Sequence, residues 1–324
     1  MSIADIGEAK LRELGYSSQF IDALPITNLT KIAGAKNAIQ YSSYYTEVIE
    51  DGQTICLVPI SEEEFREIEQ ESFEEMSARV ASQIQVVDES GNVISPNGTV
   101  SVQAAPPGSV TENVDGGTIV INTTFYDIED TRADGQFMVM SEYAWVTSPS
   151  YRGTDFFGSS RDSNIQFLSN TFGNENYYID KKVYYYAAAS GYVSETLQSS
   201  TTHYNNNLPN EVSSAYACVI ELDIPADNPP PPSLVVGQGF LASYKVNIAG
   251  GIWYEGRVQS PGTQPQGFNL YSTYWHQTSP KLIGSFSISA PLGASFTVEP
   301  QNKFANPVEH VISLNWNNEE FDII

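Results

Sequence analysis

The sequence predicts a mainly β protein: an antiparallel β-sandwich or jelly roll of about ten strands, preceded by a small acidic helical segment. After residue 117, short runs of β-branched and aromatic residues alternate with turns rich in Gly, Pro, Asn and Ser. Most helical signals lie before residue 90, in a stretch with 17 acidic and 6 basic residues. We therefore divide the chain into an acidic helical segment with a hairpin (1–90), a linker (91–117) and a sandwich domain (118–324).

The first helical signals form three short units. Residues 5–15 place apolar side chains at helical spacing and stop at Gly15, a common C-terminal residue. Residues 17–25 begin with serine caps and end at Pro25. Residues 27–39 can form a third short helix.

A hairpin and a longer helix are predicted next. Residues 44–60 alternate around Asp51-Gly52, a dipeptide typical of tight hairpin turns. Residues 61–87 open with a serine followed by three glutamates, which suit the positive end of a helix dipole. We expect one long amphipathic helix there.

Two stretches of this segment, "LRELGYSSQFIDALP" and "YYTEVIEDGQTICLVPISEEEF", carry a resemblance. They resemble the leader-type or propeptide-like segments of uncharacterised Gram-positive bacterial proteins, in which a helical Leu-Gly-aromatic unit precedes a Tyr-rich hairpin and an acidic helix. The resemblance covers about the first quarter of the chain. It implies a pro-region, a chaperone or a docking element; a helical subdomain that caps the sandwich is the alternative.

Strand candidates then follow at steady intervals. They are residues 117–128, 136–146, 164–172, 180–190, 214–224, 239–250, 268–278, 282–289, 294–300 and 309–316. In the second of them, Val139 and Tyr143 alternate with Met138 and Met140, which predicts a sheet with two unlike faces.

The net charge of the chain limits the classes of molecule that it can bind. The formal net charge is -24, which repels phosphate backbones and argues against nucleic acid. No apolar stretch is long enough to span a membrane as a helix. The composition is typical of an extracellular, cell-surface or virion protein, although residues 1–30 lack the pattern of a signal peptide. Cys56 and Cys218 are too few for a disulfide framework.

Motifs for catalysis are missing from the sequence. There is no G-x-S-x-G elbow, and His203, His276 and His310 lie far apart in ordinary surroundings. Carboxylate pairs are too common in an acidic chain to indicate a glycosidase. We expect no enzyme and no cofactor, with calcium the one possible exception. Its candidate ligands, near a turn, are Asp127, Glu129, Asp130 and Asp134, but the spacing departs from that of an EF-hand and a solvated loop is the simpler interpretation.

The stretch "YRGTDFFGSSRDSN" (151–164) is unusual in this chain, because it holds two of the nine basic residues that follow residue 90. Arg152 and Arg161 stand within three residues of Asp155 or Asp162, which predicts local ion pairs that fasten a loop anchored by two phenylalanines. A free arginine that binds an anion or a carboxylate ligand is the alternative.

Aromatic residues supply the other candidate site. Tyr184, Tyr185 and Tyr186 must alternate on a strand, so at least one ring points outward, and Trp253 and Trp275 add further amphipathic rings. Such rings stack on sugars or anchor protein contacts, although core packing explains most of them.

These observations favour a non-enzymatic β-sandwich that acts at a surface, through carbohydrate or protein contacts or by self-assembly. A secreted hydrolase with a carboxylate site is one alternative. A pore-forming β-toxin is the other, on the strength of the Ser/Thr-rich amphipathic stretch 182–202.

Overall fold

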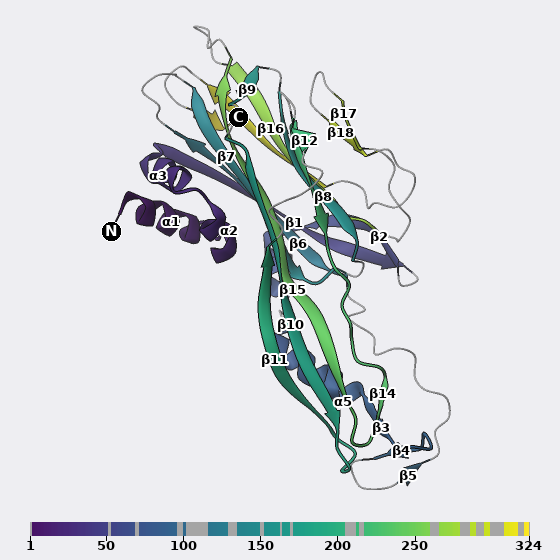
Figure 1. Ribbon diagram of the computed structural model, residues 1–324. Helices are drawn as coiled ribbons and strands as arrows, with labels where there is room; N and C mark the ends of the chain where they lie inside the picture. The colour runs from purple at the N-terminus through teal and green to yellow at the C-terminus, as the bar shows by residue number, and fades with distance from the viewer. Residues whose placement is uncertain are drawn as a thin grey trace.

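Antiparallel strands dominate the computed structural model, and the predicted sandwich of two main sheets is confirmed (Figure 1). The structure describes residues 2–50, 53–68, 71–95, 100–101, 116–128, 135–149, 152–162, 164–168, 171–204, 212–213, 217–259, 266–278, 286–289, 295–298, 308–316 and 321–323.

The larger sheet is antiparallel throughout. Its strands in spatial order are β11 (Val193–Tyr204), β10 (Gly173–Ala187), β15 (Gly239–Val258), β7 (Gln136–Thr147), β6 (Thr118–Asp127), β1 (Asn37–Glu50) and β2 (Gln53–Ile60), with β9 (Ile165–Phe167) also paired to β15. The predicted hairpin around residues 51–52 is therefore β1 and β2, and β1 lies next to β6. The acidic N-terminal segment shares a sheet with the strands that follow residue 117.

The smaller sheet packs face to face with the larger one. Its strands in order are β12 (Val212–Ser213), β13 (Ala217–Asp223), β8 (Thr154–Arg161), β16 (Gln266–Trp275), β19 (Val308–Trp316) and β20 (Phe321–Ile323). Two smaller sheets complete the described strands. One has the order β14 (Ser233–Val235), β3 (Gln85–Val87), β4 (Val93–Ile94) and β5 (Val100–Ser101), and the other pairs β17 (Phe286–Ser289) with β18 (Ser295–Val298).

Aromatic rings fill the space between the two main sheets. Phe125 and Phe137 of the larger sheet meet Phe268 and Phe321 of the smaller one, and the ring centroids of Phe137 and Phe268 are 5.8 Å apart. The alternation predicted on β7 is confirmed, since Val139 and Tyr143 belong to this core. Burial of these rings is the main stabilising contribution of the sandwich.

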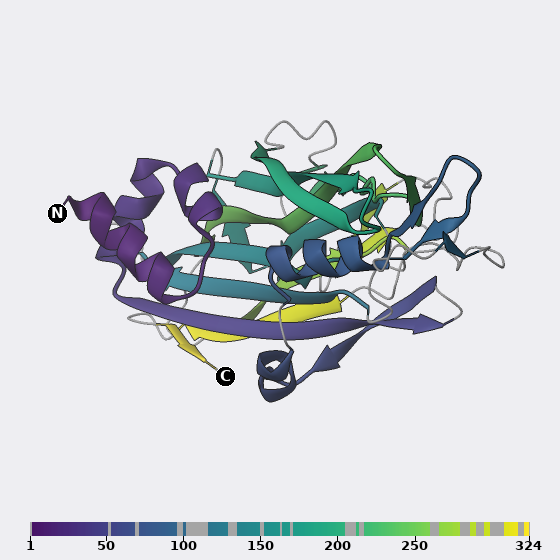
Figure 2. The same cartoon turned by 90° about the horizontal axis from the view of Figure 1, so that it is seen from below.

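The opposite face of the larger sheet is covered by an N-terminal cap, residues 3–34 (Figures 1 and 2). The cap consists of α1 (Ile3–Glu13), α2 (Ser18–Ala23) and α3 (Ile26–Gly34). The three predicted helices are present, but the third ends at Gly34, because the chain enters β1 at residue 37. Their apolar side chains, with Phe20 at the centre, bury Met138, Met140 and Trp253.

The prediction of one long helix over residues 61–87 is wrong. Two helices, α4 (Glu62–Glu67) and α5 (Phe73–Gln83), replace it. Ser72 starts the second helix, because its side chain accepts from the backbone of Glu75 while that carboxylate accepts from Ser72 in return. After α5 the chain continues into β3.

An arm extends from the sandwich, formed by the distal ends of β10, β11 and β15 (Figure 1). In the arm, α5, β3 and β14 lie against one face of the three strands. Val80 and Ile84 from the helix end pack with Tyr185, Ala242 and their neighbours in a separate apolar cluster. β15 is 20 residues long and runs through both the sandwich and the arm.

Candidate functional site

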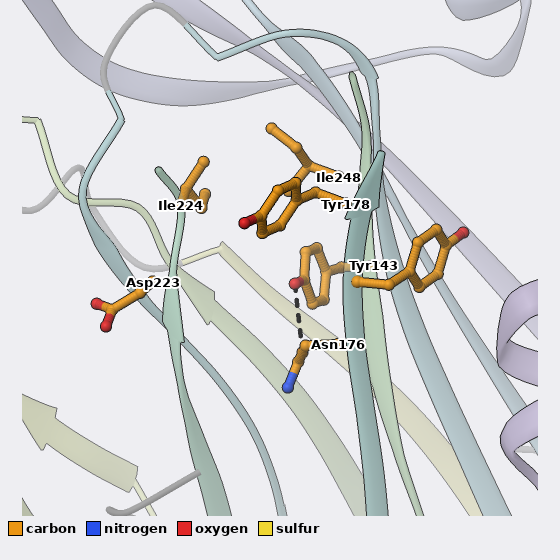
Figure 3. Close-up of a pocket in the computed structure, with 7 residues that line it drawn as sticks. Tyr143, Asn176, Tyr178, Asp223, Ile224 and Ile248 are labelled. Atoms are coloured by element: carbon orange, nitrogen blue, oxygen red, sulfur yellow. Dashed lines mark hydrogen bonds between the residues drawn. The ribbon is translucent and has the colours of Figure 1, made fainter. Parts of the chain in front are cut away.

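A small cavity lies between the two sheets, where β10 and β15 face the end of β13 (Figure 3). It is lined by Tyr143, Asn176, Tyr177, Tyr178, Asp223, Ile224 and Ile248. The hydroxyl of Tyr143 donates to Oδ1 of Asn176 over 3.4 Å across the wall of the cavity. Its volume is about 40 Å³, room for about one water molecule and too little for a sugar ring. The cavity therefore does not supply the carbohydrate site that the sequence suggests.

A buried network of polar side chains connects the two main sheets. Asp155 of β8 accepts hydrogen bonds from the hydroxyl of Tyr274 and from the backbone N–H of Gln277, and it lies 3.0 Å from Nδ1 of His276. Nε2 of His276 lies 3.0 Å from Glu47 of β1. Burial lowers the pKa of His276, but Asp155 and Glu47 outweigh it and raise the pKa to about 9. His276 is thus a protonated histidine held between two carboxylates inside the fold, with no exposure to a substrate.

Arg152 is held by partners far from it in sequence. Its guanidinium donates to Asp227 over 2.9 Å and to the backbone carbonyl of Lys245 over 3.0 Å, and both charged side chains are about nine-tenths buried. The local pairing with Asp155 is therefore wrong, because Asp155 already belongs to the network of His276. The arginine fastens the stretch as expected, through a distant carboxylate.

Arg161 is also enclosed. It is 2% exposed, donates to the backbone carbonyl of Asp162 over 2.9 Å and stacks on the ring of Phe167 at 4.8 Å. The carboxylate of Asp162 accepts instead from Asn269 over 2.8 Å. Since both arginines are buried, neither is placed to bind an anion from solution. The stretch itself is the strand β8 and not a loop, because its residues pair with β13 and β16 on either side.

The aromatic candidates divide by burial. Tyr184 and Tyr186 are 38% and 40% exposed on the outer face of the arm, whereas Tyr185 points to the opposite face and is fully buried. Trp253 lies under the cap, beside Phe20. Trp275 is buried in the smaller sheet. The prediction of an aromatic binding face is therefore wrong for Tyr185, Trp253 and Trp275. Of the five candidate rings, Tyr184 and Tyr186 are the two that a partner can reach.

The calcium candidates do not come together as a described site. Asp127 ends β6 and is buried, while Glu129, Asp130 and Asp134 lie outside the described residues. Among the residues that the structure describes, no three His, Cys, Asp or Glu side chains gather as metal ligands.

The two remaining histidines lie on strands. His203 is exposed on β11 and its ring stacks on Tyr178 at 5.0 Å. His310 is in β19, opposite Ser272, and its side chain is outside the described part.

The hairpin of β10 and β11 has two different faces. On the side of α5, Val183 and Ala187 of β10 pair with Leu197 and Val193 of β11. Residues paired across antiparallel strands project from the same face, so the other face of β11 presents the residues opposite Tyr184 and Tyr186. These residues are Thr196 and Ser194. The Ser/Thr-rich and amphipathic character of stretch 182–202 is the sequence signal for this hairpin.

No helix among the described residues is both long and apolar enough to cross a membrane. Comparison with models of protein families and with curated proteins finds no match. Among solved structures, the chain is similar to one titled "Pore forming protein", with 8% sequence identity and a TM-score of 0.23 over 70% of this chain and 97% of that one. A likeness of this size does not assign a function.

Proposed function

We propose that the protein is a pore-forming β-protein and that the hairpin of β10 and β11 is the part that enters a lipid bilayer. The observation that carries the proposal is the hairpin itself, whose two strands pair from Tyr177 opposite Tyr204 to Ala187 opposite Val193. A strand needs about 9–11 residues to cross a bilayer at the usual tilt. The paired part of the hairpin is long enough.

The distribution of side chains also suits a membrane strand. A strand in a transmembrane barrel alternates apolar residues toward lipid with polar residues toward the lumen. On β11, Val193 and Leu197 share one face, and Ser194 and Thr196 share the other. After the register shift that follows Leu197, Ser199 and Thr201 continue this row, opposite Lys182 and Asp180 of β10. The other face also carries polar residues, since Glu195 stands opposite Tyr185 and Ser200 stands opposite Lys181.

Part of the apolar face, around Val183 and Val193, is covered by a short helix. The helix α5 is 11 residues long and contributes Val80 and Ala81 to the cluster beneath it. At its start, Phe73 is held by the ammonium of Lys181, which lies 4.1 Å from the ring centroid. If α5 moves away, the same face of the hairpin meets lipid, and the backbone pairing of β10 with β11 is kept.

The turn of the hairpin suits first contact with a bilayer. Residues 188–192 carry no charge, and Gly191 takes the left-handed conformation that the turn requires. Tyr192, 60% exposed, is the most exposed tyrosine of the described hairpin. Tyrosines are enriched at the level of lipid headgroups. An uncharged end is favourable for a chain whose net charge of -24 opposes anionic surfaces.

Dye release from liposomes tests the proposal with two adjacent substitutions on β11. Leu197 is 49% exposed on the apolar side, and Thr196 is exposed on the polar side. A charge facing lipid costs about 2–4 kcal/mol near the bilayer centre, so Leu197→Asp should reduce the rate of release at least about tenfold. Thr196→Asp is the matched control and should keep most of the activity.

Both substitutions lie at exposed positions of an edge strand, so the folded protein should keep its thermal midpoint. A protein that releases no dye at any concentration overturns the proposal. So does equal loss of activity in the two variants, because it would show that the face of the hairpin does not matter.

Binding at a surface is a second proposed function, supported by the outer face of the arm. Tyr184 stands opposite Leu241 of β15, which is 48% exposed, and Tyr186 lies beside them. The ring of Tyr184 lies over Gly239, where a Cβ would come within 2.1 Å of its hydroxyl. A fixed ring of this kind can stack on a sugar or a protein partner. Retention on a glycan array that Tyr186→Ala removes would support binding; no retention of the parent protein would reject a glycan partner.

A further inference from the structure

Two carboxyl groups lie beneath the N-terminal cap, in one row across three strands. Glu142 of β7 and Glu175 of β10 are both paired with Gly251 of β15, one on each side. Residues paired in this way project from the same face. Glu142 is 3% exposed and Glu175 is 1% exposed. The cap therefore seals two acids against the sheet.

Gly251 makes room for the cap between these acids. A Cβ at this position would lie 2.6 Å from the ring of Phe20 and 2.4 Å from the carbonyl of Ser141. The central ring of the cap therefore seats directly on the backbone of β15. Any opening of the cap at Phe20 gives water access to the row.

The polar groups around the row are nearly all uncharged. Ser17, the N-cap of α2, donates its hydroxyl to Glu142 over 2.5 Å and its backbone N–H over 3.4 Å. Oε1 of Glu175 has no hydrogen-bond partner in the described part of the chain. The charge of Glu142 also acts on Tyr16 and Tyr177, since it contributes to the raised pKa of each hydroxyl.

The cations of the cap are engaged elsewhere. Arg12 donates to the hydroxyl of Ser18, and Lys10 donates to the backbone carbonyls of Ile32 and Ala33. Lys31 pairs with Glu255 over 2.5 Å. None of these three cations therefore pairs with Glu142 or Glu175. Burial accordingly raises the pKa of Glu142 and that of Glu175 to about 7 each.

We propose that protonation of Glu142 and Glu175 controls the docking of the N-terminal cap, so that the cap opens as the pH rises. Each acid is neutral in the docked state at low pH and must be buried as an anion at high pH. When the cap opens, water reaches each carboxyl and its pKa returns to the ordinary value. Ionisation of the two groups therefore favours the open state. The docking contribution is complete below about pH 4.5 and is lost as the pH rises through about 7.

Hydrogen exchange of the full chain between pH 5.5 and 8 tests this inference. Protection of residues 3–34 should fall about tenfold or more per carboxyl across this range, after correction for the intrinsic exchange rate. Strands β8 and β16 of the smaller sheet serve as the internal reference and should change little, because they do not contact the row. The double variant with Glu142→Gln and Glu175→Gln should show protection of the cap that is independent of pH.

Glu175→Gln alone covers the case in which the double variant does not fold, since it should remove about half of the pH dependence. Glu309→Gln is the matched control, because burial also raises the pKa of that carboxyl while it lies on β19, in the other sheet. Cap protection that does not change with pH in the parent protein overturns the inference. An unchanged pH dependence in Glu175→Gln and in the double variant does the same. Neither result depends on dye release, so a failure here leaves the proposed pore-forming activity to its own test.

Discussion

His276 Nε2 lies 3.0 Å from Oε1 of Glu47, with both side chains sealed from solvent between the two sheets. The other ring nitrogen meets Asp155, and the edge of the ring faces Trp145 at a centroid distance of 5.1 Å. His276 therefore forms ion pairs with a carboxylate of β1 and a carboxylate of β8. Burying these charges is favourable only while all of them are present, because any one left alone would be an uncompensated charge in the core.

Stability should fall at high pH because of this histidine. The pKa of His276 is about 9 in the folded protein and near 6.5 when unfolded. Its stabilising contribution is therefore complete below about pH 6.5 and is lost as the pH rises through about 9. Urea unfolding between pH 6 and pH 10 should show this decline. His276→Gln should lower the free energy of unfolding by about 3–5 kcal/mol at pH 6.5 and should flatten the curve above pH 7. A parent protein equally stable at pH 7 and pH 10 would rule out a protonated His276.

Arg152→Ala should destabilise the fold through a distant contact. Removal of the guanidinium leaves Asp227 largely buried without its 2.9 Å partner, which should cost about 2–4 kcal/mol. Arg257→Ala is the control, since Arg257 is exposed and donates to Gln166; its cost should stay below about 0.5 kcal/mol. Thermal unfolding of both variants makes the comparison. Equal midpoints would show that the Arg152 contact adds nothing to stability.

The aromatic residues should separate into two groups under alanine substitution. Trp253→Ala and Trp275→Ala each empty a buried site and should cost about 3–5 kcal/mol of folding free energy. Tyr186→Ala removes an exposed ring and should change stability by less than about 0.5 kcal/mol. Chemical denaturation measures each value. A loss of several kcal/mol for Tyr186→Ala would mean that its ring is a packing residue, which would remove it from the proposed binding face.

Limited proteolysis tests the predicted division of the chain. The Gly, Pro and Asn residues of the predicted linker favour cleavage between about residues 88 and 117. The two fragments should nevertheless stay together in native size-exclusion chromatography, because β1 pairs with β6 from Asn37 opposite Asp127 to Thr46 opposite Thr118. They should separate in denaturant. First cleavage within 118–324 would contradict the predicted linker, and fragments that separate under native conditions would contradict the shared sheet.

Local patterns predicted most of the elements, because these depend on near neighbours. Gly15 and Ser17 mark boundaries that the structure keeps, and the predicted hairpin appears as β1 and β2, which pair up to Glu50 opposite Gln53. Ser72 is a cap of the same local kind, but the apolar residues on either side of it favour one continuous helix and hide the break between α4 and α5. Local patterns do not predict the strand β8, because its glycines and paired charges are typical of a loop and its neighbours in the sheet come from residues 217–223 and 266–275.

Partners distant in sequence were beyond prediction. Arg152 has an acid three residues away, yet its partner is 75 residues away, because Asp155 projects into the core toward His276. The row of Glu142 and Glu175 depends on the strand order β7, β15, β10, which no local pattern contains. The amphipathic character of stretch 182–202 can be predicted from the sequence, because it depends on neighbouring residues along a strand. The packing of α5 against this stretch cannot be predicted in that way.

The course of β15 has a geometric consequence. The strand pairs with β7 from Ala249 onward and with β10 out to the far end of the arm, but its pairing with β10 shifts register between Tyr177 and Ile179, where Asn247 has a positive φ of 51°. This β-bulge lies next to the point where the pairing with β7 begins, so it bends the strand and increases its twist there. The direction in which the arm leaves the sandwich, and therefore the direction in which the turn around Gly191 points, is set at this bulge.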